Sequence, residues 1–199
     1  MKTGEVSWTR MEAGIEKVRL RLLRAAAALR AADLPYAIVG GNAVAAWVSR
    51  VDEAAVRNTR DVDILVRRAD HAKIRAALEG AGFVYRQLSA LGRAGKMDVY
   101  LERDSVKVRD ALHVIWAEEK ITPDSPEAAP DPAGAEETGG FALVPLAALV
   151  RMKLSAFRDK DRMHLRDLLE VGLIDQSWLT RLPVPLAERL RLLLEDPFG

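Results

Sequence analysis

Apolar positions along the chain follow two spacings that predict helices and strands in alternation. Residues 11–32 carry apolar side chains every three or four positions, which indicates an amphipathic helix that ends before Pro35. Short runs rich in Val, Ile, Leu and aromatic residues predict strands. The predicted strands are residues 36–41, 60–66, 83–88, 96–102, 112–117 and 141–144.

The helical spacing returns between the strands and dominates the C-terminal third. Residues 42–50 favour a helix with Asn42 as its N-cap, and residues 71–82 favour one capped by Asp70. Pro145 suits the first turn of a further helix. The helices predicted in this third are residues 145–158, about 160–171, and 185–196.

Residues 118–137 follow neither spacing. They contain seven acids, one base and four prolines. A segment of this composition buries too little apolar surface to offset the entropy of ordering. We therefore expect an exposed, mobile segment without a folded element.

The order of the elements predicts the fold class. One helix, a mixed α/β body and a helical C-terminal third indicate an α/β (α+β) protein, with a mixed sheet, flanking helices and a C-terminal helical subdomain. We expect an N-terminal helix within residues 1–35 that packs on the body, a core at 36–144, and the helical subdomain at 145–199.

Composition excludes several classes of protein and site. The 199 residues are 49% hydrophobic and 30% charged, which allows a sizeable core, and the net charge of +1 gives no general attraction to nucleic acid. The absence of cysteine excludes disulfides, zinc–thiolate sites and cysteine nucleophiles. Neither a signal-peptide core nor an apolar run of membrane-spanning length occurs. We expect a soluble, cytoplasmic protein with no membrane partner.

The peptide NTRDVDILV, residues 58–66, places two acids at the start of a predicted strand. Side chains alternate along a strand, so Asp61 and Asp63 share one face and the intervening Val62 lies on the other. Two adjacent carboxylates repel each other and resist desolvation unless a cation or strong donors compensate them. A strand that begins in solvent, with both acids hydrated, is the simpler alternative.

Two further features of the sequence could belong to the same site as the two aspartates. Gly40 and Gly41 stand where a strand meets a helix, which favours phosphate binding at free N–H groups, although a tight turn is the alternative. Asp98, in KMDVYLE, lies between apolar neighbours on a later strand and alone could be a surface acid. Three converging carboxylates would be stable only around divalent cations, and Mg²⁺ prefers such ligands and leaves positions for substrate phosphates.

These motifs resemble a known superfamily. The segments VGGNAVAAW, TRDVDILV and KMDVYL are similar to the nucleotidyltransferase superfamily, in which a Gly-Gly or Gly-Ser turn precedes an Asp-x-Asp strand and a third acid. Residues 149–175 resemble the helical segment of the AbiEii/MenT-like branch, which includes toxins of toxin–antitoxin systems. One departure is the nineteen residues between Gly41 and Asp61, a longer spacing than in many members.

The resemblance implies a role for each matching residue. Asp61 and Asp63 would bind the metal ions, and Asp98 would share one of them and assist the attacking hydroxyl. Lys153 would contact the nucleotide phosphates. The implied nucleotide contacts are Gly40, Gly41, Asn42, Arg60 and Lys153, and the implied C-terminal functional acid is Asp167, with Asp161 as its rival.

The implied reaction is transfer of an NMP from an NTP to a hydroxyl group, with release of pyrophosphate. Two Mg²⁺ ions are the implied cofactors, with Mn²⁺ as an alternative. The implied acceptor is tRNA, another RNA or a protein, and an antitoxin is an implied partner. Two alternatives remain: a small-molecule nucleotidyltransferase of the antibiotic-modifying type, and a non-catalytic binding or regulatory module, which an Asp98 turned away from the pair would favour.

Other ionisable residues have simpler interpretations. The three histidines show no metal-ligand spacing, and His113 is expected in the core or at a strand edge. His164 lies three residues from both Asp161 and Asp167, so a local ion pair is expected. The basic residues of 151–166 most simply form a solvated helix face, from which Lys153 is the first candidate for a phosphate contact.

Overall fold

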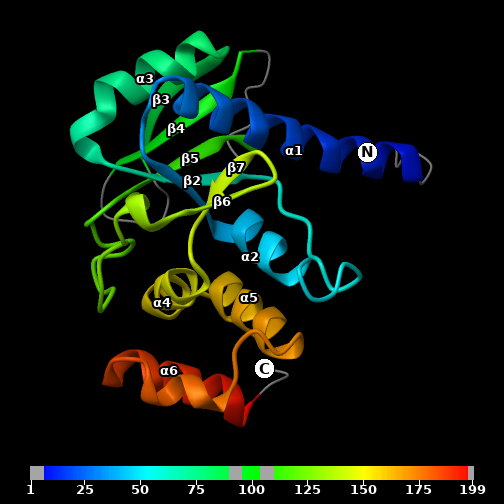
Figure 1. Ribbon diagram of the computed structural model, residues 1–199, viewed down its shortest axis with the longest axis vertical. Helices are drawn as coiled ribbons and strands as arrows, with labels where there is room; N and C mark the ends of the chain where they lie inside the picture. Colours follow the sequence, from blue (N-terminus) through cyan, green and yellow to red (C-terminus); the bar gives the residue numbers. More distant parts are fainter. Residues whose placement is uncertain (1–6, 90–95, 104–109, 197–199) are drawn as a thin grey trace.

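The strand segments form one mixed sheet at the centre of the fold (Figure 1). A computed structural model describes residues 7–89, 96–103 and 110–196. In these ranges the sheet has seven strands in the order β3-β4-β5-β2-β1-β7-β6. The β1–β7 and β2–β5 pairs are parallel and the others antiparallel. The strands are β1 (Tyr36–Val39), β2 (Val62–Val66), β3 (Phe83–Ser89), β4 (Lys96–Glu102), β5 (Leu112–Trp116), β6 (Glu136–Thr138) and β7 (Phe141–Leu143).

Helices cover both faces of the sheet (Figure 1). Ile38 of β1 is in an apolar cluster with α1 and α3, whereas Val39 is in a second cluster with α2, α4, α5 and α6. Neighbouring residues of one strand thus enter opposite layers, as strand alternation requires. This mixed α/β arrangement confirms the predicted fold class.

The helices are α1 (Trp8–Ala31), α2 (Gly40–Val48), α3 (His71–Gly80), α4 (Leu146–Ala156), α5 (Asp159–Glu170) and α6 (Val184–Glu195), with short 3-10 helices at Arg68–Asp70, Pro132–Gly134 and Gln176–Thr180.

The predicted elements occur with small shifts, and the predicted cap at Asn42 is wrong. α2 begins at Gly40, so Asn42 lies inside the helix and is not its N-cap. The reason is the positive φ of Gly40, which turns the strand into the helix within one residue. Asp70 is the N-cap residue of α3, as predicted, although its side chain makes no capping hydrogen bond.

The segment 118–137 is ordered into the fold, so the prediction of no folded element there is wrong. β6 begins within it and pairs with β7, and Lys120 forms a β-bridge with Ala128. Ser125 and Ala129 are buried. Its acidic side chains form ion pairs with arginines that are distant in sequence. Composition alone does not reveal these pairs. The ion pairs are Arg67–Asp131, Arg68–Glu119 and Arg151–Glu127.

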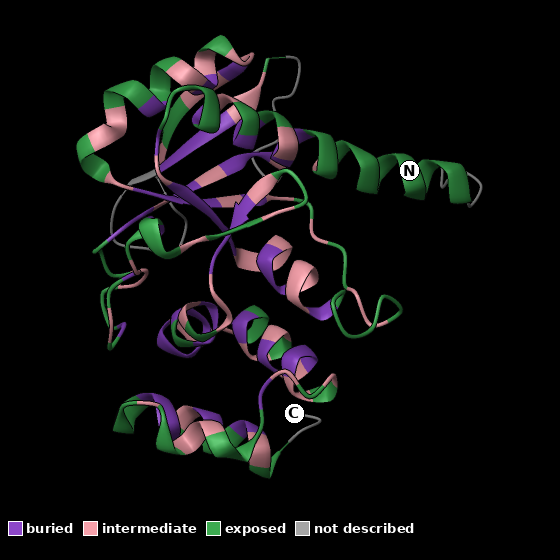
Figure 2. Ribbon diagram, viewed as in Figure 1, coloured by how far each residue is buried: buried purple, intermediate pink, exposed green. Residues whose placement is uncertain are grey.

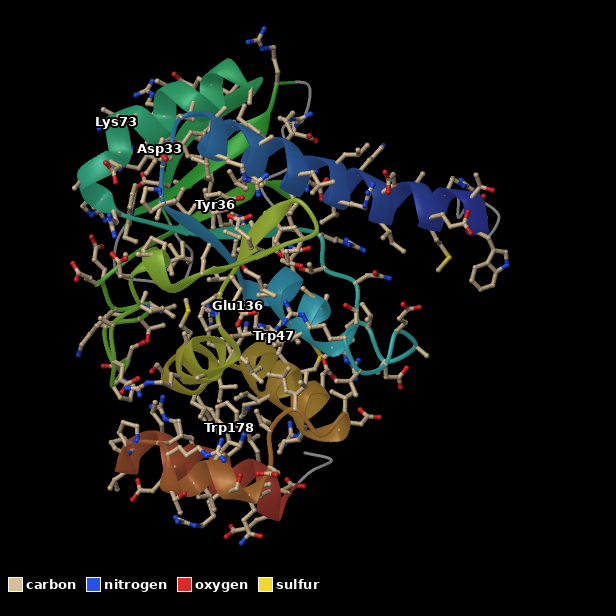
Figure 3. The ribbon with its side chains drawn as sticks, in the orientation of Figure 1. Asp33, Tyr36, Trp47, Lys73, Glu136 and Trp178 are labelled. Carbon is tan, nitrogen blue, oxygen red and sulfur yellow. The ribbon has the colours of Figure 1, made fainter. Side chains whose placement is uncertain are left out.

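The C-terminal helices share a core with the sheet (Figure 2). Leu149 of α4 and Leu190 of α6 belong to the same apolar cluster as Val39 of β1. Trp47 of α2, labelled in Figure 3, donates its Nε1–H to the carbonyl of Val144 at 3.0 Å, directly before α4. These contacts hold α4 in a defined position beside the β1–α2 turn. The boundary at residue 145 remains a prediction.

The first half of α1 projects beyond the sheet (Figures 1 and 2). Its second half is buried through residues such as Leu22 and Leu29, whereas Trp8, Met11 and Ile15 are exposed. None of the helices in the described ranges has the length and apolar character needed to cross a membrane.

Candidate active site

A strand-to-helix turn forms the base of the candidate site. Gly40 has a φ of 67° and begins α2 directly after β1. A Cβ atom added to Gly40 would lie 1.9 Å from Asp63 Oδ2, so the turn requires glycine for its backbone and for this close approach. A Cβ atom on Gly41 would lie 3.0 Å from side-chain atoms of Thr59. The glycine pair therefore packs directly against the segment that carries the two aspartates.

We expect Gly40→Ala to displace Asp63 and to lower the free energy of unfolding by about 2–4 kcal/mol, because a clash adds to an unfavourable φ. Gly172→Ala is the matched control, since Gly172 has a φ of 73° and a Cβ there would meet no described atom within 4 Å. The control should lose about 1–2 kcal/mol, the cost of the φ alone. Urea denaturation measures both losses, and equal losses would contradict a role for the Asp63 contact.

Asp61 and Asp63 converge with a histidine of the neighbouring strand. The parallel register sets His113 of β5 directly beside Asp63 of β2. His113 Nδ1 lies 3.3 Å from Asp63 Oδ1 and 3.5 Å from Asp61 Oδ2. The histidine thus supplies the positive charge that the pair of carboxylates needs, a role that the expected core or strand-edge position did not include.

Hydrogen bonds from polar neighbours fix the start of β2. Thr59 Oγ1 donates to Asp61 Oδ1 at 2.6 Å, and Asn42 Nδ2 donates to the backbone carbonyl of Asp61 at 2.7 Å. Asn42 therefore holds the backbone of the aspartate segment, and it is not among the described residues that line the cleft. The predicted contact of Asn42 with a nucleotide stays a prediction.

The contacts in this cluster shift the pKa values of His113 and Asp61. Burial disfavours the charged imidazole, but the hydrogen bonds and charges of Asp61 and Asp63 outweigh it and raise the pKa of His113 to about 10. The hydrogen bond to His113 outweighs burial and, with the Thr59 hydroxyl, holds the pKa of Asp61 well below its usual range. His164 shows the opposite effect, because burial and the nearby charge of Lys153 lower its pKa to about 4.

These shifts predict opposite pH dependences for the two histidines in the metal-free protein. The raised pKa of His113 contributes stability that is complete below about pH 6.5 and is lost as pH rises towards about 10. The lowered pKa of His164 makes stability fall as pH decreases from about 6.5 towards about 4. Imidazole NMR titration, assigned with His113→Gln and His164→Gln, should show His113 protonated and His164 neutral at pH 7. A midpoint for His113 near 6.5 would contradict the contact with the aspartates.

Asp98 does not meet the pair, so the prediction that three acids converge is wrong. Val99 is in register with His113, and strand alternation then turns Asp98 to the opposite face of the sheet. There Asp98 is 5% exposed and accepts hydrogen bonds from three side chains. The donors are Tyr85 Oη at 2.6 Å, Gln87 Nε2 at 3.2 Å and Trp116 Nε1 at 3.1 Å.

A cleft of about 800 Å³ lies between this turn and the C-terminal helices. Gly40, Gly41, Asp61, Asp63 and His113 line its sheet side. The helical side presents five further polar residues, and apolar residues complete the wall. The polar residues are Lys153, Arg158, Lys160, Asp161 and His164, and the apolar ones include Ile115, Ile121, Leu149, Met152 and Met163.

Lys153 is buried in this cleft and has a specific partner. Its Nζ lies 3.0 Å from Asp161 Oδ1, and Arg158 Nε lies 2.6 Å from the other oxygen of the same carboxylate. Two cations on one buried carboxylate leave positive charge for an anionic ligand. Burial resists ionisation of Asp161, but both cations outweigh it and lower its pKa. No ion pair of His164 with either neighbouring acid is present among the described contacts, and its Nδ1 is buried without a hydrogen-bond partner.

The two rival acids of α5 have different positions. Asp161 lines the cleft, whereas Asp167 is outside the set of described lining residues and pairs with Arg57 Nε at 2.7 Å. The structure therefore brings Asp161 to Lys153 and leaves Asp167 beside the segment before β2. Arg60 lines the cleft, and its carbonyl accepts a hydrogen bond from Arg21 at 2.9 Å.

Residues 21–108 match the family model described as aminoglycoside-2''-adenylyltransferase. The matched range contains Gly40, Asp61, Asp63 and Asp98, and it ends before His113. The match supports the resemblance to the nucleotidyltransferase superfamily and the expectation of a nucleotidyltransferase enzyme. It does not show the AbiEii/MenT-like branch. A comparison with curated proteins finds no match.

Two solved structures are similar to the chain. One, titled as the solution structure of antibiotic-resistance factor ANT(2'')-Ia, is 18% identical, covers 96% of this chain and 94% of that chain, and has a TM-score of 0.46. The other, a crystal structure of ANT(2'')-Ia in complex with adenylyl-2''-tobramycin, is 17% identical, covers 92% and 99%, and has a TM-score of 0.45.

Proposed function

We propose that this protein is a metal-dependent nucleotidyltransferase that moves an NMP from an NTP to a hydroxyl group of a small molecule. The observation that carries the proposal is the placement of Asp61 and Asp63 at a glycine turn, across one cleft from Lys153 and Lys160. Paired carboxylates suit a divalent cation, and the opposite wall suits a polyphosphate.

The charge of the cleft supports an NTP as the donor. Five of its described lining residues are Arg or Lys and three are Asp, so the wall is net positive while the metal-binding end is negative. The first turn of α2, at Gly41 and Asn42, offers free N–H groups at the positive end of a helix. The apolar wall residues can contact a nucleobase, and about 800 Å³ is enough for a nucleotide beside a small acceptor.

The donor set fits a divalent cation. Oxygen atoms of Asp61 and Asp63 and a nitrogen of His113 all lie within 4.8 Å of one another. A cation held there would neutralise charge on the triphosphate and favour ionisation of the acceptor hydroxyl. Asp61 and Asp63 would hold it, with His113 as the adjoining donor.

The remaining chemistry is positioning. The acceptor oxygen would form a bond to the α-phosphorus, the bond between that phosphorus and the β-phosphate oxygen would break, and pyrophosphate would leave with the hydroxyl proton lost to water. Lys153 would stabilise charge on the departing pyrophosphate, because Asp161, which Arg158 also contacts, fixes Lys153 in the wall. Asp98 has no part in this scheme, since it faces the other side of the sheet.

A small molecule is the acceptor that the observations support better than RNA. The net charge of +1 gives no general attraction to a nucleic acid backbone. The family model that matches residues 21–108 is described by a small-molecule acceptor, an aminoglycoside. An amine-bearing sugar is therefore the first acceptor class to test. A toxin that modifies tRNA or protein, with an antitoxin partner, remains the alternative that the AbiEii/MenT-like resemblance implies.

The test is an acceptor screen. Each of the four NTPs is incubated with Mg²⁺ or Mn²⁺ and with aminoglycosides, total tRNA or a protein extract, and pyrophosphate release and product mass are measured. An acceptor that gains the mass of one NMP, with no product from Asp61→Asn, would support nucleotidyl transfer. A product on tRNA or protein alone would overturn the small-molecule acceptor, and no product with any pool would overturn the proposed reaction.

A second candidate function has a specific observation in its favour. Asp98 is turned away from the pair, the arrangement that is expected of a non-catalytic binding module. Such a module would bind an NTP with a divalent cation, as measured by calorimetry, yet release no pyrophosphate in the screen. The nucleotidyltransferase family match is the reason that catalysis is the first proposal.

A further inference from the structure

The third donor beside the aspartate pair is a nitrogen atom. His113 Nδ1 faces both carboxylates, at 3.3 Å from Asp63 Oδ1 and 3.5 Å from Asp61 Oδ2. Asp98, which the sequence predicts as the third metal ligand, lies on the opposite face of the sheet. Among the described residues, the group of candidate metal donors is Asp61, Asp63 and His113.

The position of His113 follows from the sheet and is not a chance rotamer. β2 and β5 are parallel neighbours in which Asp63 and His113 are in direct register. Residues in register point to the same face, so His113 can only lie beside the pair. The three side chains are 15–25% exposed, which leaves them open to a small ion entering from the cleft.

Neighbouring groups aim one oxygen of each aspartate at the histidine. The Thr59 hydroxyl bonds Asp61 Oδ1 at 2.6 Å, which leaves Oδ2 as the oxygen that faces His113. Asp63 Oδ2 lies against Gly40, where a Cβ atom would be only 1.9 Å away, and Oδ1 faces His113. Such support of donor groups is how proteins fix the geometry of a metal site.

A nitrogen donor changes which cation the site prefers. Mg²⁺ favours oxygen ligands in near-ideal octahedral geometry, whereas imidazole binds first-row transition dications better. We propose that His113 binds through Nδ1 as the third ligand and that the site selects a transition dication such as Mn²⁺ or Co²⁺ over Mg²⁺. This inference rests on the proposed function, because the cation would serve that reaction, and it replaces the Mg²⁺ implied by the resemblance.

The competing interpretation is that His113 remains a protonated counter-ion and never binds metal. In that case a cation would contact the carboxylates alone, and no nitrogen would be coupled to it. The two interpretations differ in a spectroscopic signal that is independent of catalysis.

The experiment uses the full chain, with neither nucleotide nor acceptor present. Calorimetric titration with Mn²⁺, Co²⁺ and Mg²⁺ gives affinities, and pulsed EPR of bound Mn²⁺ detects a directly bound nitrogen. We expect tighter binding of Mn²⁺ than of Mg²⁺, with nitrogen coupling to the Mn²⁺. His113→Asp should abolish the coupling and reduce or reverse the preference, because it makes an all-oxygen site.

Asp98→Asn is the matched control, because it changes the acid that sequence reasoning placed in this site. It should leave both the metal preference and the nitrogen coupling unchanged. His113→Asn is the second variant, used if three adjacent carboxylates prevent His113→Asp from folding, and circular dichroism checks the fold of each. It should lose the nitrogen coupling.

Three results would overturn the inference: Mn²⁺ bound without nitrogen coupling, equal affinity of the wild type for Mn²⁺ and Mg²⁺, or no binding of any of the three ions. Each is distinct from failure of the proposed function. A nitrogen-coupled Mn²⁺ site in a protein that transfers no NMP would support the metal site and refute the enzyme. NMP transfer that Mg²⁺ and Mn²⁺ support equally, without nitrogen coupling, would support the enzyme and refute the proposed metal site.

Discussion

Replacement of Asp63 by asparagine is expected to reduce nucleotidyl transfer on the order of a thousandfold or more, because the donor set for the cation loses a charged ligand. The same substitution should remove most of the rise in melting temperature that a divalent cation and NTP give to the wild type. Because Asp63 Oδ1 contacts His113, the stability of this variant without metal tests the site as well.

Without metal, Asp63→Asn should destabilise the fold by about 1–3 kcal/mol, since His113 loses one of the two carboxylates that hold its proton. A pair of hydrated surface acids would behave differently, because removal of one would be within about 0.5 kcal/mol of neutral. Melting curves with and without cation and NTP separate these cases. Asp98→Asn is the control for activity, since that acid lies on the opposite face of the sheet and should leave transfer intact in folded protein.

Asp161→Asn is expected to cost about 3–5 kcal/mol of folding free energy, the largest loss for any single substitution of a charged residue in the cleft. Asp161 is 1% exposed, and both Lys153 and Arg158 donate to its carboxylate. Removal of its charge leaves the buried Lys153 and the partly exposed Arg158 without their partner. Nucleotide affinity should also fall, because Lys153 loses the group that fixes its position.

Asp167→Asn is the matched comparison, because Asp167 lies on the same helix and is 5% exposed. Its partner, Arg57, has a side chain that is 57% exposed and can return to water, so the loss should be about 1 kcal/mol. Urea denaturation and calorimetry with NTP measure both effects. Equal stability losses, or a larger loss of NTP affinity from Asp167→Asn, would show that the wrong acid has been assigned to the site.

The pH profile gives an independent test of Asp161. Its pKa is lowered in the folded protein, so the stability that it contributes is present above about pH 3.9, the unfolded value, and is lost as pH falls through the lower folded value. Asp161→Asn should flatten this acid limb of the stability curve. An acid limb identical to that of the wild type would contradict the two cation contacts.

Local patterns determined much of the fold and one half of the site. The period of apolar residues was enough to place most strands and helices, because alternation and helical spacing depend only on neighbours in the chain. The same alternation put Asp61 and Asp63 on one face, and the glycine pair marked the turn beneath them. The fold class followed from the order of these elements.

Long-range pairing decided the rest. β5 lies beside β2 as a parallel strand, and only this pairing brings His113 to the aspartates. The two-residue period of LHVIW shows that the side chains of His113 and Leu112 point to opposite faces of the strand. No local signal shows which strand pairs with this one. The order of the acidic segment 118–137 was likewise not predicted, since the arginines that pair with its acids are distant in sequence.

Register decided the place of Asp98. Val99 is the residue opposite His113, so Asp98 faces the α1 and α3 layer; a shift of the β4 register by one residue would have turned it into the cleft. A similar geometric choice separates Asp161 from Asp167, two acids of one helix. The sequence by itself determined which residues could carry charge at this site, whereas tertiary packing decided which of them meet, because strand order and register are set by contacts between segments far apart in the chain.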